Sequence, residues 1–142
     1  MATRYFALIL GIVYVVIGLM GFVPAFLTPP PATAPEVTVD TLYGYLLGIF
    51  PVNILHTLVH LVVGVWGVLA YRSFSASRTF AQVVAVVFGL LTIMGLIPGL
   101  STTFGLVPLH GADIALHAVT TLLAVYFGFV APAERPVGER MP

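Results

Sequence analysis

The chain has 142 residues, of which 60% are hydrophobic and 7% are charged, and its mean hydropathy is +1.12. This composition lies outside the range of soluble globular domains and predicts an integral membrane protein in contact with the lipid bilayer. The formal net charge is zero and the sequence contains neither Cys nor Lys, which excludes disulfides, thiolate ligands, cysteine nucleophiles and a nucleic-acid-binding surface.

Four apolar segments are candidates for membrane-spanning helices, since about 20 residues cross a hydrocarbon core at about 1.5 Å per residue. We predict helices over residues 5–27, 52–71, 79–97 and 109–130, within a single transmembrane domain over residues 1–131. The Pro-rich stretch between the first two predicts an external loop with a short apolar turn over residues 28–51. Residues 132–142 are polar and Pro-rich and predict a disordered tail.

The arginines predict how the chain is oriented in the membrane. They occur at the N-terminus, between the second and third predicted helices, and in the tail, at Arg4, Arg72, Arg78, Arg135 and Arg140. These three places share one side of the membrane, and the positive-inside rule assigns that side to the cytoplasm. We therefore expect a multi-pass protein with cytoplasmic N- and C-termini.

A sequence pattern occurs twice, in residues 48–60 and 105–117. Both copies follow G-[IL]-[FV]-P-[VL]-[NH]-x-x-[HD]-x-x-x-H. A shorter match, MGFVP at residues 20–24 and MGLIP at residues 94–98, ends the first and third predicted helices. The two matches predict two parallel helical-hairpin repeats that form an all-α four-helix bundle. If each Pro opens a helix, the polar residues of each copy share one helix face.

The polar faces contain all four histidines of the chain and one acid within an apolar segment. Two-fold symmetry would pair His60 with His117, His56 with Asp113, and Asn53 with His110. Imidazole and carboxylate ligands suit a transition-metal ion such as Zn, Fe or Cu. We predict a metal site with four ligands in the outer half of the membrane. Two further side chains either support these ligands or act as extra ligands. The four are His56, His60, Asp113 and His117, and the two are Asn53 and His110.

Two alternatives stay open at this point. A b-type haem could take His60 and His117 as axial ligands, with Gly64 and Gly67 leaving room for the macrocycle. Alternatively, the polar residues form only a helix-packing network or proton path, and the chain is an accessory structural subunit of a larger membrane complex or a homo-oligomer. The sequence shows no polar channel beyond the cluster, so metal binding, sensing or electron transfer is favoured over hydrolysis, and enzymatic activity is undecided with a leaning against it.

The two copies P-V-N-I-L-H-T-L-V-H and P-L-H-G-A-D-I-A-L-H also carry a family resemblance. The sequence resembles small bacterial membrane proteins catalogued as domain of unknown function 4383. The resemblance covers most of the chain and implies four membrane helices in a bacterial cytoplasmic membrane. It implies no activity, substrate or cofactor.

Overall fold

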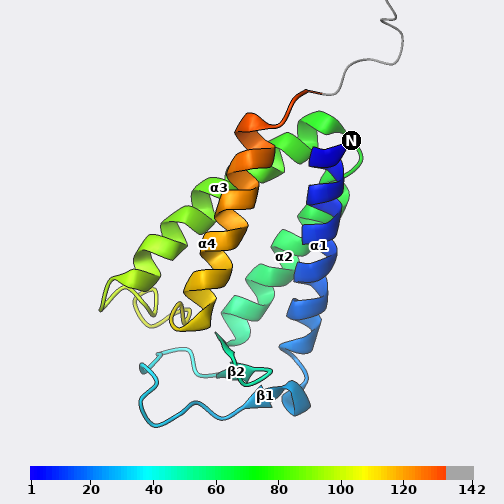
Figure 1. Ribbon diagram of the computed structural model, residues 1–142. Helices are drawn as coiled ribbons and strands as arrows, with labels where there is room; N and C mark the ends of the chain where they lie inside the picture. Colours follow the sequence, from blue (N-terminus) through cyan, green and yellow to red (C-terminus); the bar gives the residue numbers. More distant parts are fainter. Residues whose placement is uncertain (134–142) are drawn as a thin grey trace, which may run out of the picture.

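The computed structural model describes residues 1–133 and consists mostly of helices. The predicted tail lies outside the described residues from position 134 onward. The helices are α1 (Ala2–Met20), α2 (Ile54–Ala70), α3 (Phe74–Leu96) and α4 (Ala112–Val125), and α4 continues as a π-helical turn over Tyr126–Val130. Figure 1 shows α1 packed along α2 and α3 packed along α4.

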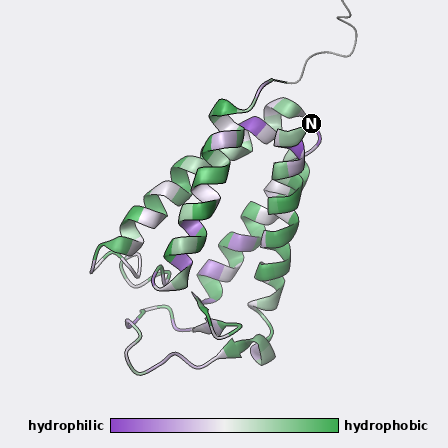
Figure 2. Cartoon of the chain, viewed as in Figure 1, coloured by the Kyte–Doolittle hydropathy of each residue, from purple (hydrophilic) through white to green (hydrophobic). Residues whose placement is uncertain are grey.

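The helices present apolar surfaces to their surroundings. Among the described residues, three helical stretches are long and apolar enough to cross a membrane: Ala2–Met20, Phe74–Leu96 and Ala112–Val130. The remaining helix, α2, is also apolar but has only 17 residues. Figure 2 shows hydrophobic colour along all four helices, interrupted by hydrophilic positions in the first turns of α2 and α4. The chain is therefore a helical membrane protein.

The first helix is shorter at its end than the predicted range of 5–27. It ends at Met20, and Pro24 opens a 3-10 turn over Pro24–Phe26. Proline has no backbone N–H and disfavours the helical conformation in the residue before it, so the apolar run changes direction here although its hydropathy does not change.

The segment predicted as an external loop contains strands. β1 (Leu27–Thr28), β2 (Gly44–Leu46) and β3 (Phe50–Val52) form an antiparallel sheet in the order β1-β2-β3. Leu27 pairs with Leu46, and Gly44 pairs with Val52. The sheet covers the end of the molecule where α1 ends and α2 begins (Figure 1).

The starts of the remaining helices also differ from the predicted ranges, because side-chain caps precede α2 and α3 and a glycine precedes α4. Pro51 lies in edge strand β3, where a missing N–H is tolerated, and Asn53 caps α2 by accepting a hydrogen bond from the His56 N–H at 3.0 Å. Ser73 caps α3, which therefore starts at Phe74 and not at residue 79. Gly111, with φ of 65°, precedes α4, so this helix starts three residues after the predicted position 109.

Close contact between α1 and α2 depends on glycines. A Cβ added to Gly64 would lie 2.6 Å from the Val15 nitrogen, and one added to Gly11 would lie 2.6 Å from the Val68 nitrogen. A Cβ on Gly67 would lie 2.8 Å from the Ala7 carbonyl oxygen. Gly64 and Gly67 thus allow two helix backbones to approach, as small residues do in membrane helices, and they do not leave room for a macrocycle as the haem alternative assumed.

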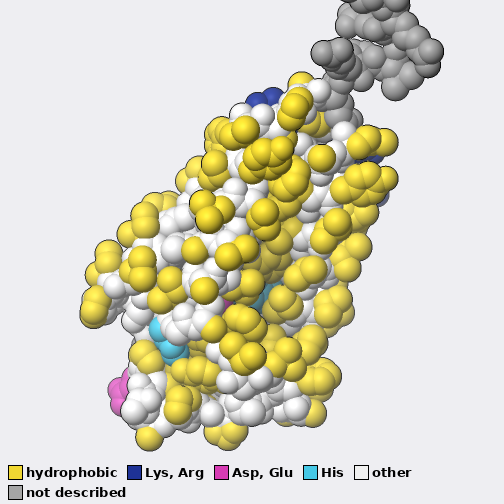
Figure 3. All heavy atoms as spheres, viewed as in Figure 1, with side chains coloured by type: hydrophobic (Ala, Val, Ile, Leu, Met, Phe, Trp, Pro, Cys, Tyr) yellow, Lys and Arg dark blue, Asp and Glu magenta, His cyan; other side chains and the backbone are white. Residues whose placement is uncertain are grey.

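The described arginines gather at one end of the molecule. Arg4 Nε donates to the Tyr71 carbonyl at 2.8 Å, and Arg78 Nε donates to the Gly128 carbonyl at 3.0 Å. At the same end the rings of Phe6 and Phe127 stack with centroids 4.6 Å apart, which joins α1 to the end of α4. Figure 3 shows basic side chains near this end and acidic side chains at the opposite end.

Candidate metal centre

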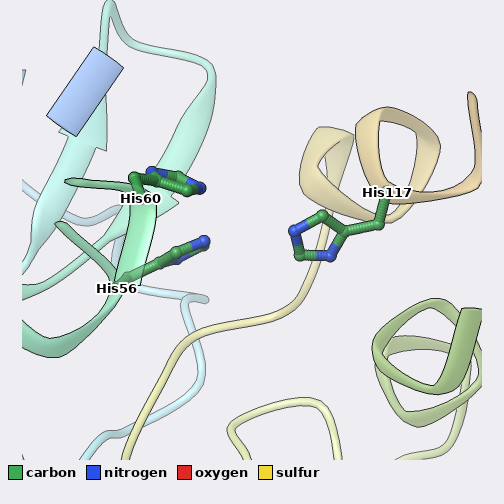
Figure 4. A group of neighbouring side chains, drawn as sticks. All are labelled: His56, His60 and His117. Atoms are coloured by element: carbon green, nitrogen blue, oxygen red, sulfur yellow. The ribbon is translucent and has the colours of Figure 1, made fainter. Parts of the chain in front are cut away.

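Three histidines converge in the interior between α2 and α4. His56 and His60 lie one turn apart on α2, and His117 approaches from α4 (Figure 4). One nitrogen from each ring can be chosen so that all three lie within 4.8 Å of one another. Ligand nitrogens around a tetrahedral Zn²⁺, at about 2.0–2.1 Å from the ion, are about 3.3 Å apart. A movement of about 1–2 Å in total would therefore close the three rings around an ion.

Aromatic side chains hold the three rings in place. The His60 ring packs 5.0 Å from the Tyr14 ring, and the His117 ring meets Phe88 edge-on at 4.9 Å, measured between centroids. His56 and His60 lie 4.4 Å apart. All three imidazoles are buried, with at most 3% of their surface exposed. The site is thus enclosed by protein on most sides.

Asp113 lies beside the histidines. One carboxylate oxygen is 3.5 Å from His117 Nδ1, and the other is 4.0 Å from His56 Nε2. The side chain is 1% exposed and is not part of the three-residue group defined by mutual distance. A carboxylate next to Nδ1 favours the tautomer in which Nε2 of His117 is free to bind a metal. The structure thus places Asp113 where it can orient a ligand, while its predicted role as a ligand stays a prediction.

Asn53 connects the start of α2 to the segments that precede α2 and α4. Besides capping the helix, its Nδ2 donates to the Val39 carbonyl at 2.8 Å and to the Leu106 carbonyl at 2.7 Å. Leu106 belongs to the second copy of the repeated pattern, so this amide holds the two copies together. All of its hydrogen-bonding groups have protein partners, and its position fits a supporting role better than that of a ligand.

His110 lies apart from the other histidines, in the segment before α4. Its Nδ1 is 3.5 Å from the hydroxyl oxygen of Tyr45 in β2. Partial burial lowers the pKa of His110, which favours the neutral ring. The predicted pairing with Asn53 is replaced by this contact with the sheet.

The buried polar atoms of the cluster lack hydrogen bonds. Within the described residues, no partner with hydrogen-bond geometry is found for a set of imidazole and carboxylate atoms: His56 Nδ1, both ring nitrogens of His60, His117 Nδ1 and both oxygens of Asp113. A packing network would satisfy such atoms with each other, because each unpaired buried polar group costs about 1–3 kcal/mol. These nitrogen and oxygen atoms therefore fit a metal-binding site better than a network of hydrogen bonds.

A cavity of about 250 Å³ adjoins the three histidines. Its walls come from α2, α3 and the segment before α4, and besides the histidines they consist of Val59, Val87, Phe88, Leu91, Thr103, Val107 and Leu109. Pockets that hold drug-sized ligands span about 300–1,000 Å³, so this volume does not favour a haem. No pattern in the sequence predicts these walls, because apolar residues in a membrane helix look alike whether they line a cavity or face lipid.

Comparison with known proteins identifies one family. A family model described as "Domain of unknown function (DUF4383)" matches residues 4–130, a range that includes nearly all of the four helices and both copies of the repeated pattern. No curated protein and no solved structure matches the chain.

Proposed function

The chain belongs to the DUF4383 family, and we propose that this member binds a transition-metal ion through His56, His60 and His117. The observation that carries the proposal is the convergence of three buried imidazoles, in which both nitrogens of His60 and the Nδ1 atoms of His56 and His117 lack hydrogen-bond partners among the described residues. Neutral imidazole is a common ligand of Zn, Cu and Fe, and ionisable groups inside membrane helices mark functional sites by default.

The charge of the site supports a divalent ion. Asp113 supplies a buried carboxylate within 4.0 Å of two of the imidazoles. A carboxylate without a partner in a low-dielectric interior is unfavourable, and a nearby cation removes that penalty. The ion and Asp113 thus stabilise each other, and the carboxylate orients His117 at the same time.

The site belongs, in this proposal, to the outer half of a bacterial cytoplasmic membrane. The arginine end of the structure supports this orientation through the positive-inside rule, since the histidines lie toward the opposite end. His60 comes six residues after the start of α2, about 9 Å into the helix at 1.5 Å per residue. The close pairs α1–α2 and α3–α4 support a bundle of two hairpin repeats, in which both copies of the pattern contribute to one site.

The function of such a site is metal binding linked to sensing or electron transfer. Three protein ligands leave room for a fourth, which distinguishes this arrangement from a closed structural site.

Total metal in the purified protein tests the proposal. The wild type is purified in mild detergent without chelators or a His tag, and metals are measured by mass spectrometry. We expect stoichiometric metal in the wild type and in the control variant His110→Ala, and its loss in the double variant His60→Ala/His117→Ala. A metal-free wild type that is folded and does not take up Zn²⁺, Cu²⁺ or Fe²⁺ would refute the proposal and favour the structural-subunit alternative.

Thermal unfolding provides a second readout that does not depend on metal retained during purification. A ligand at about 100 times its dissociation constant stabilises the folded state by about 2.7 kcal/mol. The melting temperature of metal-free wild type and His110→Ala should therefore rise with added metal. That of the double variant should not change, whatever its starting value.

A further inference from the structure

The cavity beside the histidines differs from the rest of the site in its chemistry. The three imidazoles form one wall. Of the other described residues that line it, all are apolar except Thr103, whose hydroxyl already donates to the Val107 carbonyl at 3.1 Å. None of these walls offers a charge or a free hydrogen-bond donor to a ligand. A molecule in this cavity would therefore be uncharged and mostly apolar, with its polar atom directed at the imidazoles.

The cavity has a side entrance between α2 and α3. Val59 of α2 and Val87 of α3 both line the cavity, and they are 45% and 43% exposed, which places the entrance between these two helices. Val59 is five residues into α2, and Val87 is nine residues from the outer end of α3, so the entrance lies about 8–14 Å along the helices. In a bilayer this surface faces hydrocarbon, so a ligand enters from the lipid.

The volume limits the size of the ligand. An apolar cavity of about 150 Å³ binds benzene, so about 250 Å³ accommodates one substituted aromatic or quinoid ring and not a larger fused system. A ring with an oxygen substituent could place that oxygen at the open coordination position while its body fills the apolar walls.

We propose that the cavity beside His56, His60 and His117 binds an uncharged, lipid-soluble single-ring molecule of the phenol or quinone class, whose oxygen becomes the fourth ligand of the metal. This inference rests on the proposed function, because the oxygen needs a bound ion to coordinate. It adds the chemical class of the ligand and its route of entry from the bilayer.

Cobalt substitution gives a direct readout, because the visible spectrum of Co²⁺ changes when its coordination changes. Protein loaded with Co²⁺ in detergent is titrated with 4-ethylphenol. We expect a saturable spectral change. Ethylbenzene, which has the same apolar body without the oxygen, should compete with 4-ethylphenol without changing the spectrum itself. The charged analogue 4-hydroxybenzoate should produce no change.

Two neighbouring valines provide a matched pair of variants. Val87→Trp fills the entrance, and we expect it to retain Co²⁺ while weakening 4-ethylphenol binding by about tenfold or more. Val86→Trp is the control, because Val86 is 58% exposed and does not line the cavity. It should behave as the wild type does.

The outcomes separate this inference from the proposed function. If Co²⁺ does not bind to folded wild type, the proposed function fails and this inference fails with it. If Co²⁺ binds but 4-ethylphenol leaves the wild-type spectrum unchanged, or if Val87→Trp and Val86→Trp respond alike, the ligand proposal alone is wrong and the cavity holds only lipid chains or packing space.

Discussion

Replacing Asp113 by Asn separates a metal-supporting carboxylate from a structural one. The substitution keeps the shape of the side chain and a hydrogen-bonding group, but it removes the negative charge 3.5 Å from His117 Nδ1 and 4.0 Å from His56 Nε2. Loss of a residue that supports a metal ligand typically lowers metal affinity by about 10- to 100-fold. We therefore expect the affinity of Asp113→Asn to be lower by this factor, which corresponds to about 1.4–2.7 kcal/mol.

The same substitution should have the opposite effect on the metal-free protein. Both carboxylate oxygens are buried without hydrogen-bond partners among residues 1–133, and a buried unpaired polar group costs about 1–3 kcal/mol, more when it is charged. An amide loses less than a charged group does on burial, so metal-free Asp113→Asn should be at least as stable as metal-free wild type.

Competition with a chromophoric chelator measures the affinity, and thermal unfolding in excess chelator measures the stability of the metal-free protein. Asp113→Glu provides a control that keeps the charge. The reasoning is refuted if Asp113→Asn binds metal as tightly as the wild type, or if it is clearly destabilised without metal, because a destabilised variant means that the carboxylate mainly holds helices together.

Three further predictions concern the surroundings of the site. Asn53→Ala removes a helix cap and two donated hydrogen bonds, so the free energy of unfolding should fall by about 2–3 kcal/mol. Circular dichroism during denaturation in mixed micelles measures this decrease, and an unchanged free energy would contradict the role of Asn53 as a cap and connector. Gly64→Ala places a Cβ 2.6 Å from the Val15 nitrogen and should lower the melting temperature, whereas the control Gly89→Ala meets its nearest neighbour at 3.4 Å and should change it little. Burial lowers the pKa of folded His110, so the unfolded chain takes up more protons at this position and the stability should fall as the pH drops below about 6.5. The melting temperature of His110→Gln should therefore fall less between pH 7.5 and pH 5 than that of the wild type. Equal decreases would exclude this contribution.

The helices could be predicted from the sequence because hydropathy indicates whether a segment lies in lipid or in water. The residues at which the helices begin were predicted less well. Pro51 and Pro108 were expected to open helices, and a proline fits the first helical turn and an edge strand equally well. The polar caps were not used for the prediction, although Asn53 and Ser73 each precede a helix in the structure. A capping residue indicates where a helix begins because its side chain hydrogen-bonds to the first turn, whereas a proline only excludes certain backbone conformations.

The candidate site was predictable in part. The spacing of His56 and His60 placed both on one face of a helix, and the second copy of the pattern brought His117 to meet them. The position of Asp113 to the side of the three rings depends on how α4 is placed against α2, which the pattern could not specify. The cavity depends on how far apart α2 and α3 lie, and this is a property of packing between distant segments.

The contacts at the two ends of the molecule have a mechanical consequence. At the arginine end, Arg4 holds the turn after α2, the Phe6–Phe127 stack joins the helix pairs, and the Gly128 carbonyl accepts hydrogen bonds from both Arg78 and Gln82. At the opposite end, Asn53 and the backbone N–H groups of Thr38 and Val39 join the first half of the chain to the segment before α4. Between these two ends, an ion bound by His56, His60 and His117 would tie α2 to α4 a third time, so that ion binding would cross-link the helix pairs along their length.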